Sequence, residues 1–241
     1  MECWAACLGN CGGGPSREHY ISDGIFDGRI VNAFGLDWCK SEPKNIGLAS
    51  ATAKILCKVH NQALSPFDAE AAKLSRFLTS NVLDVPENSN SIQLNGALLE
   101  KWALKTCVNL GFIGALDPET HIRVLPEPGH VRAIFGSTKA AEGAGLYFIY
   151  GKLNSEDYKN GLSWHAIRNL TDRDRIVGMH FMFNGLRFVV SLVSVRAEPL
   201  LLKMGMVDGL DFSTAKIDYR PKSIRMRSAD AGEKIIELSW Y

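Results

Sequence analysis

The chain has 241 residues, which is enough to bury one large core or two small ones without disulfide bonds. Its composition is that of a globular protein, 46% hydrophobic and 22% charged, and no apolar run is long enough to cross a bilayer. The net charge is only +1, which excludes recognition of nucleic acid through bulk charge, so any basic surface must be local.

The N-terminal segment has no basic flank followed by an apolar stretch, so no secretory signal is expected. We therefore expect a protein of the reducing cytosol, whose six cysteines are thiols or metal ligands. Cys39 and Cys107 have no partner at ligand spacing and are expected to be ordinary buried thiols.

Two close pairs of metal-ligating residues lie in the first sixty positions. Three residues separate Cys7 from Cys11, and two residues separate Cys57 from His60. Four ligands of this type suit tetrahedral Zn²⁺, and a site filled by four protein ligands is structural. Cys3 is also three residues before Cys7, so Cys3 is an alternative ligand. The alternative to zinc is a set of unrelated buried thiols and a core histidine.

Two helices are expected next. The sequence SPFDAEAAKLSRFL (65–78) offers Ser65 as N-cap and Pro66 at the first helical position, followed by apolar residues at helical spacing. After a polar loop, DVPENSNS (84–91), the sequence LNGALLEKWALKTCVNL (94–110) predicts a second amphipathic helix.

Beyond Ala144 the pattern changes to short apolar runs bounded by Gly, Asn or Pro, which predict strands. These runs are GLYFIYG (145–151), RIVGMHFMFNG (175–185), LRFVVSLVS (186–194), PLLLKM (199–204), SIRMRS (223–228) and KIIELSW (234–240). Asn184-Gly185 separates two of them and predicts a tight hairpin, because both residues tolerate positive φ.

One basic concentration occurs near the C-terminus and is interrupted by a single acid, Asp218. It consists of Lys216, Arg220, Lys222, Arg225 and Arg227. It is either a phosphate-binding stripe or a solvated strand edge rich in Lys and Arg.

The strings SREHYIS (16–22) and ILCKVHN (55–61) lie directly after the first cysteine pair and at the second ligand pair. Together they resemble the HNH, or ββα-metal, nucleases, in which a zinc-stapled hairpin and helix hold an acidic-His dipeptide opposite an Asn or His. Glu18-His19 matches the dipeptide, and Asn61 matches the final Asn or His. The resemblance covers about residues 3 to 78.

The resemblance implies a metal-dependent phosphodiesterase. A histidine can take a proton from water at neutral pH, so His19 is the candidate general base. Glu18 and Asn61 offer the oxygen ligands that Mg²⁺ or Mn²⁺ prefers. Adjacent residues on a strand point to opposite faces, so Glu18 and His19 cannot both reach a phosphate without a bulge or twist.

The sequence departs from the family pattern at several places. Thr52 stands near the position of the family's middle Asn, and Asn45 is a possible substitute. The first cysteine pair is spaced by three residues instead of two, Ser22 replaces the usual Pro, and the loop 23–50 is long.

These observations predict an α+β protein with three parts: an HNH-like nuclease module (1–80), a helical connector (81–143) and an antiparallel β-rich domain (144–241). The expected activity is metal-dependent endonuclease cleavage of nucleic acid, with DNA favoured, structural zinc and catalytic Mg²⁺ or Mn²⁺. No membrane partner is expected, and a homo-oligomer is compatible with the sequence. The alternatives are an inactive zinc-dependent nucleic-acid-binding or scaffold module, and a nuclease controlled by a ligand bound to the β-rich domain.

Overall fold

The computed structural model describes residues 3–80, 90–117, 120–136, 143–150, 161–169, 172, 175–193, 216–228 and 232–241. Its helices are α1 (Lys58–Gln62), α2 (Ser65–Thr79), α3 (Gly96–Phe112) and α4 (Pro128–Phe135). The strands are β1 (Pro15–His19), β2 (Ile30–Ala33), β3 (Lys44–Gly47), β4 (Thr52–Cys57), β5 (Ser91–Asn95), β6 (Gly145–Tyr150), β7 (Leu162–Arg168), β8 (Ile176–Phe183), β9 (Leu186–Ser191), β10 (Lys216–Tyr219), β11 (Ser223–Ser228) and β12 (Gly232–Ser239). The predicted mixed α+β class is confirmed, and no described helix is long and apolar enough to cross a membrane.

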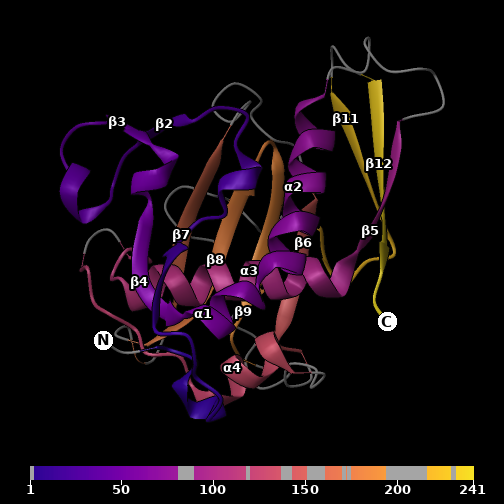
Figure 1. Ribbon diagram of the computed structural model, residues 1–241. Helices are drawn as coiled ribbons and strands as arrows, with labels where there is room; N and C mark the ends of the chain where they lie inside the picture. Colours follow the sequence, from indigo (N-terminus) through magenta and orange to yellow (C-terminus); the bar gives the residue numbers. More distant parts are fainter. Residues whose placement is uncertain are drawn as a thin grey trace.

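The N-terminal part contains two small antiparallel pairs. β1 pairs with β4, and α1 begins directly after β4. The residues between β1 and β4 form a separate ribbon, β2–β3, which lies on the far side of the molecule from the small C-terminal sheet (Figure 1). The long connection predicted between Asp23 and Ser50 is therefore an ordered two-stranded arm.

The first predicted helix is α2, which begins at Ser65 with Pro66 in its first turn. Ser65 is the first helical residue and not the N-cap, because Leu64 before it already has a right-handed helical conformation. The chain therefore turns from α1 into α2 without a side-chain cap.

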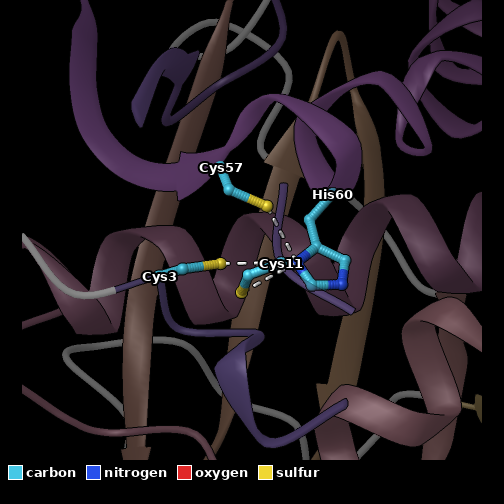
Figure 2. A group of neighbouring side chains, drawn as sticks. All are labelled: Cys3, Cys11, Cys57 and His60. Atoms are coloured by element: carbon cyan, nitrogen blue, oxygen red, sulfur yellow. Dashed lines mark hydrogen bonds between the residues drawn. The ribbon is translucent and has the colours of Figure 1, made fainter. Parts of the chain in front are cut away.

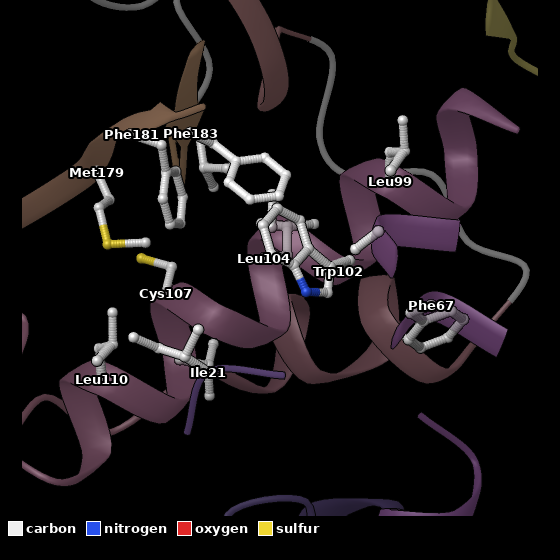
Figure 3. Close-up of a cluster of buried hydrophobic side chains, with 14 of the residues drawn as sticks. Ile21, Phe67, Leu99, Trp102, Leu104, Cys107, Leu110, Met179, Phe181 and Phe183 are labelled. Carbon is white, nitrogen blue, oxygen red and sulfur yellow. The ribbon is translucent and has the colours of Figure 1, made fainter. Parts of the chain in front are cut away.

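The second predicted helix, α3, occupies the centre of the molecule. It was expected to be amphipathic, but thirteen of its seventeen residues are buried, because the five-stranded sheet packs on one side and α2 on another. Trp102 lies against Phe181 and Phe183 of the sheet (Figure 3) and also contacts Phe188. Burying α3 on all sides also buries its polar residues, which must find partners inside the protein.

The main sheet has the order β10-β6-β9-β8-β7 and is antiparallel throughout. The predicted hairpin is confirmed: Asn184 and Gly185 join β8 to β9 with φ values of 46° and 82°. Strands β7 and β10 were not predicted, because their sequences lack a continuous apolar run. The predicted strand 199–204 lies outside the described residues.

A second sheet has the order β11-β12-β5. β5 comes from the predicted connector and pairs with β12 in parallel. The prediction of a purely antiparallel C-terminal domain therefore does not hold for this sheet. One hydrophobic cluster extends from Trp4 through Trp102 to Leu238. The three predicted parts therefore share one core.

A buried ionic network joins the N-terminal part to α3. Lys105 is fully buried, and its ammonium group donates to Glu18 at 2.7 Å and lies 2.9 Å from Asp68. Ser22 donates to Asp68 at 2.5 Å and accepts from the indole of Trp102 at 2.9 Å. One lysine on α3 thus holds both β1 and α2.

We expect Lys105→Met to lower the free energy of unfolding by about 3–5 kcal/mol, because it leaves Glu18 without its cationic partner in the interior. Urea denaturation of the two proteins measures the difference. Lys73→Met is the control: Lys73 is exposed, and its partner Glu70 keeps a hydrogen bond from the backbone N–H of Asn95, so that change should cost about 1 kcal/mol or less. Equal losses in the two variants would contradict the role given to Lys105.

Candidate metal centre

Four side chains meet near the N-terminus: Cys3, Cys11, Cys57 and His60 (Figure 2). One ligand atom from each lies within 4.8 Å of all the others. The three sulfur atoms surround Nδ1 of His60 at 3.4, 3.8 and 3.2 Å respectively. Three thiols and one imidazole nitrogen around a common point form a set suited to a closed, structural zinc site.

Strand and helix boundaries place these ligands. Cys57 is the last residue of β4, and His60 lies in the short helix α1 that follows. The N-terminal loop is held beside them by hydrogen bonds from Lys58 N to Gly14 O (3.0 Å) and from Trp4 N to Ile55 O (3.1 Å). The cluster therefore fastens the first residues of the chain to the β4–α1 junction.

The predicted ligand set needs one correction, because Cys3 and not Cys7 joins Cys11. Cys7 lies in a 3-10 turn, Ala6–Leu8, and is exposed. The buried side chain of Trp4 packs into the core and draws its neighbour Cys3 towards β4. Three residues separate Cys3 from Cys7 and Cys7 from Cys11, so spacing alone did not decide between the two, and the burial of Trp4 favours Cys3.

The electrostatics of the cluster favour a cation. Burial raises the pKa of the Cys57 thiol, but backbone N–H groups of His60 and Gly12 donate to its sulfur and bring the pKa below its usual value. Burial, followed by the neighbouring Cys3 and Cys57, raises the pKa of Cys11 to about 11. Three adjacent thiolates repel one another, and a bound divalent cation removes that repulsion.

A second layer of contacts orients His60. Its Nε2 donates to Oδ1 of Asn10 at 2.7 Å, which leaves the lone pair of Nδ1 directed at the three sulfur atoms. Burial lowers the pKa of His60, so the neutral, ligating form of the imidazole is favoured. The ring of Phe135 on α4 packs against the imidazole, with 5.1 Å between ring centroids.

The predicted acidic-His pair is divided between the two faces of β1. Glu18 is buried and accepts hydrogen bonds from Lys105 and Asn109, and burial raises its pKa. His19 is half-buried at the end of the strand, opposite Thr52 of β4. The β1–β4 bulge lies opposite Arg17 and does not bring Glu18 to the face of His19, so the structure gives Glu18 a structural partner, Lys105.

Asn61 on α1 is tied to the strand that carries His19. Its side-chain Nδ2 donates to Oγ of Ser16 at 2.8 Å and to the carbonyl oxygen of Arg17 at 2.9 Å. Both amide hydrogens are thereby used, and Oδ1 is left as the atom that could hold a cation. Thr52 takes part in the turn before β4 through Ala49 O, whereas Asn45 binds Asn32 across the β2–β3 ribbon.

The predicted basic stripe is split between two sheets. Arg220 makes a two-point contact with Glu100, at 2.9 and 2.5 Å, and its pKa is raised by that hydrogen bonding. Arg225 lies 3.6 Å from Glu233, and Lys222 is exposed. The side chains of Lys216 and Arg227 lie outside the described residues. Arg220 is therefore held by Glu100, and its role in binding nucleic acid stays a prediction.

Another set of basic residues surrounds the β1–β4–α1 unit and was not singled out from the sequence. It consists of the exposed residues Arg17, Lys54 and Lys58. They are separated along the chain by up to forty-one positions, so only the pairing of β1 with β4 brings them onto one small unit.

Comparison of the chain with protein-family models, curated proteins and solved structures finds no match.

We expect Cys7→Ser to keep one zinc ion per chain, and Cys3→Ser to lose it or bind it far more weakly, because Cys3 contributes a sulfur to the cluster and Cys7 does not. Metal analysis of the purified variants measures this, and Co²⁺ substitution reports thiolate coordination through its absorption bands. If Cys7→Ser loses zinc and Cys3→Ser retains it, the ligand is Cys7, as predicted from the sequence, and not Cys3.

Asn10→Ala should keep the zinc stoichiometry but lower zinc affinity by about 10- to 100-fold, because it removes the hydrogen bond that orients His60. Competition with a chelator measures the affinity. Asn32→Ala removes a side-chain hydrogen bond in the β2–β3 ribbon and is the matched control, with unchanged affinity expected. An Asn10→Ala affinity equal to the control would show that Asn10 does not orient the ligand.

Proposed function

We propose that the protein is a zinc-stapled, metal-dependent nuclease of the HNH type that hydrolyses phosphodiester bonds, with DNA as the favoured substrate. The observation that carries the proposal is the unit β1–β4–α1: an antiparallel pair followed by a helix, closed at its base by the Cys/His cluster. His19 ends one strand of this unit, and Asn61 on its helix is hydrogen-bonded to that strand.

The chemistry assigns different tasks to the two residues. His19 is the general base that removes a proton from the attacking water, and its half-buried position leaves it within reach of a substrate. Oδ1 of Asn61 is the ligand offered to Mg²⁺ or Mn²⁺, which would neutralise charge on the phosphate and its leaving oxygen. Glu18 is not included, because Lys105 and Asn109 use its carboxylate in the interior.

The basic residues Arg17, Lys54 and Lys58 supply the phosphate contacts in this proposal. They are exposed on the same unit that carries His19 and Asn61. Contacts of lysine and arginine with phosphate groups supply affinity without reading sequence, which suits a protein whose net charge is only +1. Lys222 and Arg225 belong to another part of the surface, beside the small C-terminal sheet.

A second function has a specific observation in its favour. Because Glu18 is internal, Asn61 is the only one of the two predicted protein ligands left for a catalytic cation. An inactive zinc-dependent module that binds nucleic acid through Arg17, Lys54 and Lys58 would need neither a base nor a second metal. Cleavage activity separates the two functions.

Supercoiled plasmid incubated with the zinc-loaded protein should be nicked or linearised in Mg²⁺ or Mn²⁺ and left intact in EDTA. His19→Ala should reduce the rate by at least about 100-fold, since general-base catalysis contributes on that scale. Gel electrophoresis measures the rates, and metal analysis must show the same zinc content in both proteins. His165→Gln, on β7, is the control histidine and should cleave like the wild type.

If His19→Ala cleaves plasmid at the wild-type rate, His19 is not the general base. If the wild type retains zinc and binds plasmid in a salt-dependent manner without cutting it under any of these conditions, the binding module replaces the nuclease.

A further inference from the structure

A cavity of about 320 Å³ lies beside the C-terminal half of α3, away from the β1–β4–α1 unit. Most of its lining is apolar, including Val108 and Gly111 of α3, Leu116, and Ile176 and Leu192 of the main sheet region. Its volume is at the lower end of the range for small-molecule sites. An apolar cavity of this size fits a compact organic molecule and not a nucleic-acid strand.

Charged side chains lie at the same cavity. Arg123 and Arg175 both line it, both are exposed, and neither has an ion-pair partner among the residues that the structure describes. His130 also lines it and is held in place by a hydrogen bond from its Nε2 to Leu192 O at 2.9 Å. Glu127 is the one carboxylate among the lining residues that the structure describes, so within this set the two guanidinium groups leave an excess of positive charge.

The wall that carries Arg123 is fixed to α3 by the backbone. Val124 N donates to Gly111 O at 2.8 Å, close to the end of the helix. A Cβ on Gly111 would come within 3.3 Å of Val124 Cβ, so glycine allows this close contact. Cys107 in the same lining is an inert wall residue, because burial raises the pKa of its thiol to about 12.

We propose that this cavity binds a small organic anion, whose apolar body lies against Val108 and Leu116 and whose carboxylate or phosphate group meets Arg123 and Arg175. Guanidinium groups bind carboxylate and phosphate through paired hydrogen bonds, and the apolar floor excludes a bare inorganic ion as the best ligand. The site goes beyond the proposed nuclease function and shares none of its residues.

Three probes with the same naphthalene body test the charge requirement: 2-naphthoate, 2-naphthol and 2-naphthylmethylammonium. Isothermal titration calorimetry of the zinc-loaded full chain should show binding of the carboxylate, at least 10-fold weaker binding of the neutral alcohol, and no binding of the cation. Equal affinity for all three probes, or no binding of 2-naphthoate at millimolar concentration, would overturn the proposal.

Substitutions at the exposed arginines locate the site without disturbing the core. Arg123→Gln and Arg175→Gln should each weaken 2-naphthoate binding by roughly 10-fold or more, which is the scale of one charge-assisted hydrogen bond. Arg29→Gln removes another exposed arginine, outside the cavity, and should leave the affinity unchanged. If Arg29→Gln weakens binding as much as the cavity variants do, the anion binds through general surface charge and the site is wrong.

Amide chemical shifts supply an independent location. Saturating 2-naphthoate should shift the backbone signals of Val108, Gly111 and Val124 and leave those of Asn61 and His19 in place. Shifts confined to the β1–β4–α1 unit would instead place the anion at the proposed nuclease site.

Discussion

The ammonium group of Lys105 lies in the interior between the carboxylates of Glu18 and Asp68, and removal of the lysine would leave the buried carboxylate of Glu18 without its cation. This lysine connects α3 with β1 and α2, so the position of the N-terminal part depends on the central helix. Asn109, one turn later, donates to Glu18 and accepts from the indole of Trp4. Helix α3 thereby holds both Trp4, which follows Cys3, and Glu18, which precedes His19.

The cluster of Cys3, Cys11, Cys57 and His60 acts on the same part of the chain. Burial and the neighbouring Cys3 and Cys57 raise the pKa of the Cys11 thiol, because adjacent thiolates would repel one another without a cation. Binding of zinc would convert this repulsion into folding energy and fasten the first residues to the β4–α1 junction. The ion pair of Lys105 with Glu18 and the Cys/His cluster therefore both position the short strand β1.

Strand alternation then decides what each residue of β1 can do. Glu18 points inward to Lys105, and His19 lies on the other face, half-buried and opposite Thr52. The carboxylate of Glu18 is used inside the protein, while the side chain of His19 stays partly exposed to solvent. The cavity beside Val108 and Gly111 lies along the same helix but away from this unit, so α3 supports two separate candidate sites.

Local patterns in the sequence determined α2, the Asn184-Gly185 hairpin and the pairing of Cys57 with His60, because each depends on residues a few positions apart. The choice of Cys3 over Cys7, the ion pairs of Glu18 and Arg220, and the parallel pairing of β5 with β12 were decided by the tertiary structure. Each of these depends on a partner far away in the chain, and periodicity carries no information about such partners. Sequence spacing could place Glu18 and His19 together, but only the burial of Lys105 determined which of the two turns inward.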